Sequence, residues 1–236
     1  TPHADGAGYE LDTRLRPSGE QGHLVVSLDS FRAYHVGEEG AAGPRAQDWE
    51  RQALLRLRAC GGDASVGEKA EAIARVAGYD RGPIDPVELL RLRERLEVEV
   101  ARERAGRHDV KLGRGGLADV EFAVQYLQMQ SGRDDAVRTP ETLVALDVLE
   151  ARGTLKPAHA GTLRDGYRFL RRLEQRARVV HGARSALLEE SAPGLTPLAR
   201  SMGYRDGPTG AASQQLVEAY REITNEVRAA FLEVVR

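Results

Sequence analysis

Hydrophobic and polar residues alternate strictly over residues 9–16, close to the start of the chain. An alternation with a period of two is typical of a half-buried strand. Residues 17–19, Pro-Ser-Gly, predict a turn, and the short apolar run in residues 22–27 predicts a second strand after it. The pattern therefore predicts a pair of short strands at this end of the chain.

Apolar residues recur at helical spacing in the remainder of the chain, which predicts that this part is almost entirely helical. Asp63 or Ser65 can cap one helix, and Asp85 followed by Pro86 is typical of the first turn of another. The expected helices cover residues 28–35, 46–60, 63–78, 85–104, 116–131, 140–152, 159–181, 197–202 and 214–235.

Gly82 and Pro83 mark the expected domain boundary, because both residue types interrupt helices. The predicted fold class is α+β and predominantly helical. The first domain, residues 1–81, would hold the strand pair and two or three helices. The second domain, residues 82–236, would form an antiparallel helical bundle.

Composition and charge exclude several classes of protein. The 236 residues include 34 basic and 36 acidic ones, which gives a formal net charge of -2. A non-specific nucleic-acid binder would show a basic surplus, so nucleic acid is not an expected partner. No apolar run approaches the ~18 residues of a membrane span, so a membrane is not expected either. Cys60, the one cysteine, cannot form an internal disulfide, which favours the cytoplasm, and we expect it in the core.

Arginine supplies nearly all of the basic residues, since only Lys69, Lys111 and Lys156 are lysines. One interpretation is codon bias, and the other is anion recognition, because the rigid arginine fork binds carboxylate and phosphate well. Most arginines, including those in residues 91–107 and 171–178, are expected to supply only solvated charge. The functional hypotheses depend on the positions of a few of the arginines.

The first of these positions is a cluster on the predicted first strand. Asp12, Arg14 and Arg16 fall on one face of it, and alternate residues on a strand lie about 7 Å apart. A carboxylate suits Mg²⁺, and arginines beside it would stabilise phosphate charge. The alternative is an edge strand with a charged solvent face, which protects a sheet edge from aggregation.

A glycine-rich segment, residues 111–116, precedes the helix expected at residues 116–131. Backbone N–H groups at such a helix start can approach an anion, and Lys111 and Arg114 add positive charge there. The segment is no dinucleotide-binding fingerprint, because a charged helix rather than a strand precedes it. The alternative is an ordinary helix N-terminus in which Asp119 is an acid of the cap region.

Residues 49–58 form a third candidate segment. Its arginines, Arg56 and Arg58, are placed to contact a nucleotide or to pair with Glu50. The alternative is an amphipathic core helix with a rim of salt bridges. Elsewhere the histidines show no zinc-ligand spacing.

Five segments, in this order along the chain, resemble the adenylyltransferases that modify glutamine synthetase. They are residues 9–19 (YELDTRLRPSG), 47–58 (QDWERQALLRLR), 109–130 (DVKLGRGGLADVEFAVQYLQMQ), 168–176 (RFLRRLEQR) and 198–204 (LARSMGY). The resemblance implies that the first domain is part of a nucleotidyltransferase domain, with its strand pair from the rear half of the palm. The wording of the first segment is more like the C-terminal, adenylylating domain of that bacterial family.

The resemblance also implies a chemistry. Family members transfer AMP from ATP to a tyrosine of glutamine synthetase and so regulate nitrogen assimilation, with Mg²⁺ as cofactor and a PII signalling protein as a further partner. Asp12 matches the third metal-binding carboxylate and is the implied catalytic residue. Motif membership implies phosphate- or nucleotide-binding roles for Arg14, Arg16, Arg56, Lys111 and Arg114, with Glu50 and Glu121 in support.

The family's other two metal-binding carboxylates come from an Asp-x-Asp after a Gly-Ser helix start, and neither motif occurs here. We therefore expect a fragment that needs the missing N-terminal part of its own chain as a partner. Alone it is expected to be inactive, because one carboxylate does not hold the two metal ions of such a site. Two alternatives stay open: a non-catalytic helical module that binds a regulator or glutamine synthetase, and the related deadenylylating domain, which removes AMP by phosphorolysis.

Overall fold

A computed structural model describes residues 12–13, 15–38, 40, 43–101, 103–181, 187–208 and 210–236. The chain divides into two compact units, Thr1–Arg81 and Gly82–Arg236, which we call the first and the second unit. No helix in these described ranges is both long and apolar enough to cross a membrane. The assignment of the first unit to a nucleotidyltransferase domain stays a prediction.

The first unit is built from short helices. They are α1 (Leu28–His35), α2 (Asp48–Leu54) and α3 (Ala64–Arg75), and α3 continues into the π-helical turn η2 (Val76–Asp80). Asp63 Oδ1 accepts hydrogen bonds from the backbone N–H groups of Ser65 and Val66, so it caps α3 as the sequence predicts. A small core of Leu54, Ala74 and Ala77 holds the helices together.

The predicted strand pair of the first unit is not found among its described residues. Residues 22–27, the second predicted strand, contain no strand, and Gly19–Gln21 forms a turn of 3₁₀-helix (η1) instead. Residues 9–11 and 14 of the first predicted strand lie outside the described residues. A period of two shows which residues fit a strand, but a ladder also needs partners, and an isolated hairpin is marginal in water.

Two other predictions for the first unit are wrong. Helix α2 ends at Leu54 and not at residue 60. The apolar stripe extends beyond the helix because Leu57 packs on the core from the segment that follows. Cys60 therefore lies past the helix and is exposed rather than buried.

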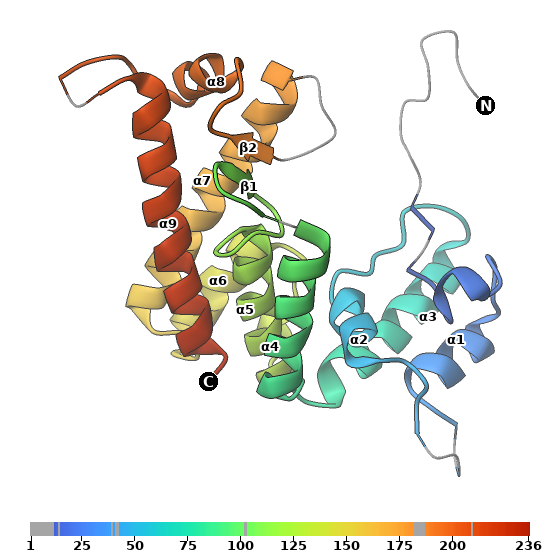
Figure 1. Ribbon diagram of the computed structural model, residues 1–236. Helices are drawn as coiled ribbons and strands as arrows, with labels where there is room; N and C mark the ends of the chain where they lie inside the picture. The colour runs from blue at the N-terminus through green and yellow to red at the C-terminus, as the bar shows by residue number, and fades with distance from the viewer. Residues whose placement is uncertain are drawn as a thin grey trace, which may run out of the picture. The chain divides into compact units, whose positions relative to one another are not determined.

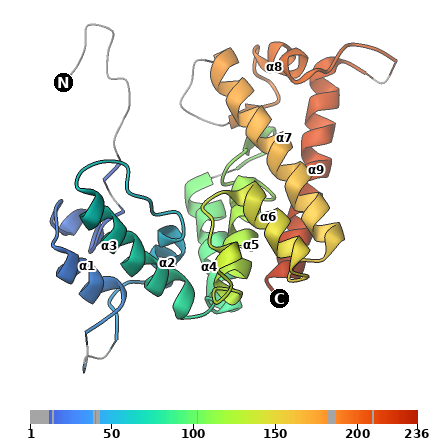
Figure 2. The ribbon, with the colours of Figure 1, turned by 180° about the vertical axis from the view of Figure 1, so that it is seen from behind.

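The second unit is a helical bundle (Figures 1 and 2). Its helices are α4 (Pro86–Arg95) with its π-helical extension η3 (Leu96–Ala101), α5 (Leu117–Gln130), α6 (Thr142–Ala151), α7 (Pro157–His181), α8 (Leu195–Met202) and α9 (Ala212–Val234), with a 3₁₀ turn η4 (Asp135–Val137). The long helices α7 and α9 pack against each other in opposite directions. Fully buried side chains, such as Leu170, Leu173 and Leu216, fill the space between the helices.

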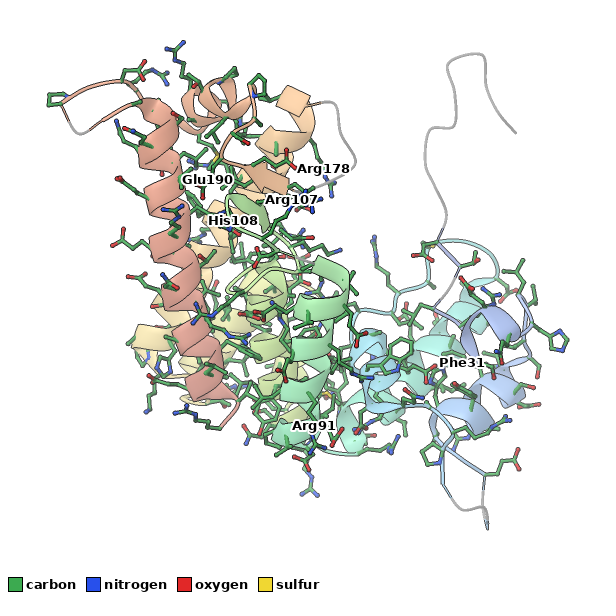
Figure 3. The ribbon with its side chains drawn as sticks, viewed as in Figure 1. Phe31, Arg91, Arg107, His108, Arg178 and Glu190 are labelled. Atoms are coloured by element: carbon green, nitrogen blue, oxygen red, sulfur yellow. The ribbon has the colours of Figure 1, made fainter. Side chains whose placement is uncertain are left out.

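The sheet of the described residues lies in the second unit. Strand β1 (Arg107–Asp109) pairs antiparallel with β2 (Leu187–Glu189), with His108 opposite Leu188. Figure 3 shows His108 beside Glu190, and the His108 Nε2 atom lies 2.8 Å from Glu190 Oε1. Strands of three residues are too short to give a periodic signal. The predicted fold class, α+β and predominantly helical, is confirmed, but the sheet lies elsewhere in the chain.

Candidate functional site

A pocket of about 450 Å³ opens in the first unit between α1, α2 and the segment before α1. Apolar side chains, including Phe31 and Leu54, line one part of it, and Figure 3 shows Phe31 on α1. Charged side chains line the rest: Arg16, Arg56, Arg58 and Glu50. The pocket thus combines an apolar wall with a positively charged rim.

Three residues from two of the predicted sequence motifs meet in this pocket. Arg16 comes from the first motif, and Glu50 and Arg56 come from the third. Arg16 also supports the local backbone, since its guanidinium donates to the carbonyl oxygens of Gly22 and Glu20, each at 3.3 Å. Its place in a folded turn, rather than on a strand face, brings it to the pocket.

Glu50 is the buried acceptor of the pocket, with 5% of its surface exposed. Its carboxylate accepts hydrogen bonds from Tyr34 Oη at 3.0 Å and from the Gln47 backbone N–H at 2.8 Å. The second bond completes a capping box at the start of α2. Burial, and secondly the Glu50 carboxylate, raise the pKa of Tyr34. Glu50 therefore joins α1 to α2.

His35 is a pocket residue that sequence reasoning missed. It ends α1, is 4% exposed, and lies edge-on to Phe31 and Tyr34, at centroid distances of 4.5 and 4.9 Å. Within the described residues its Nδ1 atom has no hydrogen-bond partner. A neutral imidazole offers one donor and one acceptor, so His35 adds an unused polar group to the pocket. A lone histidine carried no signal for this position.

The pH dependence of stability should report on His35. Burial lowers the pKa of His35 from 6.5 to about 4, so the unfolded chain binds a proton that the folded chain does not bind in this range. The free energy of unfolding should thus have its full value above pH 6.5 and decrease toward pH 4, by at most ~1.4 kcal/mol per pH unit. His35→Gln should flatten this dependence, measured by urea unfolding followed through Trp49 fluorescence.

The matched control is His23→Gln, because His23 is an exposed histidine of the same unit. It should keep the wild-type dependence on pH. A His35→Gln variant that loses stability between pH 6.5 and 4 as steeply as the wild type would refute the assignment.

The first motif is only partly described. Asp12 is exposed, and Arg14 lies outside the described residues. In the described part of the chain, no group of three or more His, Cys, Asp or Glu side chains could hold a metal ion. These residues alone therefore do not fit a complete magnesium site, and any magnesium held by Asp12 would need ligands from outside them.

A carboxylate of the protein itself, that of Asp119, lies at the glycine-rich segment of the second unit. The fully buried Asp119 carboxylate accepts from the Gly115 N–H at 2.8 Å and from Arg93 Nε at 2.5 Å, and Arg228 Nη1 lies 3.3 Å away. Gly115 has φ +70°, a conformation that favours glycine. Its backbone also lies against α9, because a Cβ at this position would lie 1.8 Å from the Thr224 carbonyl oxygen. The helix start is thus a packed structural junction.

The other predicted residues of the second unit lie around this junction. Lys111 and Arg114 are exposed, and Arg114 Nη1 donates to Asn225 Oδ1 at 3.2 Å. Glu121 pairs with Arg171 at 2.8 Å. The contact of Asp119 with Gly115 supports the alternative in which Asp119 is an acid of the cap region. The phosphate-binding roles of Lys111 and Arg114 stay predictions.

Comparisons with known proteins identify the family. Residues 1–73 match the model of the glutamate-ammonia ligase adenylyltransferases, and residues 90–235 match the model of the GlnD PII-uridylyltransferases. A bifunctional glutamine synthetase adenylyltransferase/adenylyl-removing enzyme of Stenotrophomonas maltophilia strain K279a is 36% identical over 229 residues, which cover 95% of this chain and 23% of that enzyme. The enzyme of the same description from Streptomyces avermitilis is 37% identical over 207 residues, covering 86% of this chain and 20% of the relative.

The chain thus spans between a fifth and a quarter of the length of the curated relatives that it matches. The two family models match residues in both units. The chain belongs to the family of the bifunctional glutamine synthetase adenylyltransferase/adenylyl-removing enzymes.

Proposed function

We propose that this chain is part of an enzyme that transfers AMP from ATP to a tyrosine of glutamine synthetase. The observation that carries the proposal is the pocket of the first unit, in which Arg16, Glu50 and Arg56 from two family motifs meet. The wording of the first motif supports the adenylylating rather than the adenylyl-removing half of the bifunctional enzyme. The product would be a modified glutamine synthetase, and the reaction would regulate nitrogen assimilation.

The residues of the pocket have different proposed roles in binding a nucleotide. Arg16, Arg56 and Arg58 supply the positive charge for phosphate oxygens, because guanidinium groups bind phosphate through charge-assisted, often bidentate hydrogen bonds. Glu50 positions α2, the helix that precedes Arg56 and Arg58, since it fixes the start of α2 and accepts a hydrogen bond from Tyr34 of α1. The apolar wall excludes water, which strengthens these interactions.

Asp12 is proposed as one carboxylate of a magnesium site, on the resemblance alone. Magnesium bound there would supply positive charge to the triphosphate of ATP. We also propose that the chain alone does not transfer AMP, because the described residues provide too few carboxylates for that site. Incubating the chain with ATP and glutamine synthetase should give no incorporation of AMP, whereas measurable incorporation would contradict this.

Arg56→Ala in the full-length enzyme tests the role of the pocket. A hydrogen bond from an arginine to a charged group contributes about 1.5–3 kcal/mol, so its loss should raise the KM for ATP at least about tenfold. Arg75→Ala is the matched control, because Arg75 is an exposed arginine of the same unit that does not line the pocket. It should change the KM by less than about twofold. An unchanged KM in Arg56→Ala would remove the pocket from the proposal.

A second candidate function concerns the second unit by itself. This unit is separately compact, and residues 90–235 match a model described for PII-uridylyltransferases. We propose as the alternative that it is a non-catalytic module that binds a PII signalling protein or glutamine synthetase. Binding of either partner by the chain without nucleotide would favour the module, and binding that requires Mg-ATP would favour the catalytic role.

A further inference from the structure

A groove of about 540 Å³ runs along α7 of the second unit, far from the residues of the first-unit pocket in sequence. Four arginines of α7 line it: Arg168, Arg171, Arg172 and Arg176. Among the described residues that line the groove there is no aspartate or glutamate. The groove is therefore a concentrated positive surface on a chain whose formal net charge is -2.

One of the four arginines is already neutralised within the unit. Arg171 contacts the carboxylates of Glu121 and Glu174, each at 2.8 Å, and its guanidinium lies 5.1 Å from the centroid of the Tyr167 ring. Arg178, labelled in Figure 3, is held in the same way by Glu174. The carboxylates of Glu121 and Glu174 offset the charge of Arg171, so the other three lining arginines account for the charge of the groove.

The excess charge comes from Arg168, Arg172 and Arg176. All three are exposed, and within the described residues Arg172 and Arg176 have no ion pair. Arg168 has, in the described part of the chain, a single ion pair, a contact of 3.8 Å to the exposed Asp165. Their spacing of four residues places them in one row along the helix, about 12 Å from first to last. A single phosphate group is too small to meet all three.

Apolar side chains accompany the row of arginines. Leu143 of α6 lines the groove, and so does Val179 of α7, which is 78% exposed. A partner that covers them would gain from burying apolar surface as well as from charge pairing. Nucleic acid supplies no such apolar side chains, and the chain lacks the basic surplus that nucleic-acid binders show.

We propose that this groove binds an acidic amphipathic helix of a partner protein. Such a helix carries carboxylates at every fourth residue, about 6 Å apart, which matches the spacing of Arg168, Arg172 and Arg176. Apolar residues beside the carboxylates would cover Leu143 and Val179. This inference is independent of the nucleotide pocket and uses none of its residues.

The probe for the test is a fluorescein-labelled helical peptide with glutamate at every fourth position and leucine on the flank of that row. Fluorescence anisotropy of this peptide is titrated with the full 236-residue chain at low and at raised salt. We expect binding that weakens with salt. The same peptide with glutamine in place of glutamate, and a single-stranded DNA of similar length, are the competing probes, and equal or tighter binding of either would overturn the proposal.

Charge reversal locates the binding. Arg172→Glu/Arg176→Glu should weaken binding of the glutamate peptide at least about tenfold, since two attractions become two repulsions. Arg95→Glu/Arg133→Glu is the matched control, because both are exposed arginines of the second unit outside the groove. It should change the affinity by less than about twofold. An equal loss in the control pair would show general attraction to charge and would overturn the site.

A rescue keeps the test independent of folding. A peptide with lysine in place of glutamate should bind the Arg172→Glu/Arg176→Glu variant more tightly than it binds the wild type. Rescue requires a folded α7, so an unfolded variant cannot produce it. Failure of the rescue in a variant with wild-type circular dichroism would contradict the proposed pairing.

Discussion

Replacing Asp119 by alanine is expected to destabilise the second unit by about 3–5 kcal/mol, the range typical for removal of one partner of a buried ion pair. Arg93 is 1% exposed, and its Nε atom donates to the Asp119 carboxylate at 2.5 Å. Without Asp119, the buried guanidinium loses its closest charge partner, which leaves the longer contact to Glu97 at 3.6 Å, and the Gly115 N–H loses its acceptor. Arg228, at 3.3 Å, loses a contact as well.

Urea unfolding followed by far-UV circular dichroism measures this loss. Asp165→Ala is the control. The Asp165 side chain is 81% exposed, and its contact with Arg168 is long, at 3.8 Å. Its effect should stay within about 0.5 kcal/mol. The double variant Arg93→Met/Asp119→Leu should be less destabilised than Asp119→Ala, because it leaves no unpaired buried charge. A loss below about 1 kcal/mol in Asp119→Ala would show that the junction is not held by this ion pair.

The helices were largely predictable because their signals are local. Residues 28–35 form α1 as predicted, and Asp63 and Asp85 cap α3 and α4. A cap and an apolar stripe are both defined by neighbours in the sequence. The strands were not predictable, since β1 and β2 are three residues each and pair across nearly eighty residues of chain.

The pocket of the first unit was not predictable from the sequence, although motifs had singled out three of the residues that line it. Motifs pointed to Arg16, Glu50 and Arg56, and only the fold shows that they line one pocket with His35. The glycine-rich segment shows the reverse. Its sequence suggested a site for an external anion, but the anion at this helix start is Asp119, whose partners Arg93 and Arg228 are distant in the sequence.

The arginines of α7 also differ from the prediction for a reason that a local pattern does not contain. The arginines of residues 171–178 were interpreted as solvated charge, and Arg171 and Arg178 instead pair with carboxylates. Helical periodicity predicts that Arg168, Arg172 and Arg176 share a face. It does not predict that the same face is a groove bordered by α6. The groove depends on how two helices pack, which a local pattern does not contain.

The largest effect on activity is expected for Asp12→Ala in the full-length enzyme. Asp12 is the carboxylate proposed for the magnesium site, and it is exposed, so its removal should leave the fold intact. A magnesium site of the proposed kind uses several carboxylates together, so the loss of one should weaken metal binding even where the others are present. We expect a loss of at least about 10³-fold in AMP transfer, which corresponds to about 4 kcal/mol in the barrier.

The direct measurement is incorporation of radiolabelled AMP from ATP into glutamine synthetase by the full-length Asp12→Ala enzyme. Asp29→Ala, which removes another exposed aspartate of the first unit, is the control and should transfer AMP normally. Phosphate-dependent release of AMP from modified glutamine synthetase should persist in Asp12→Ala. Loss of this release with intact transfer would assign the chain to the adenylyl-removing half, and unchanged activity in both directions would contradict the proposed catalytic role.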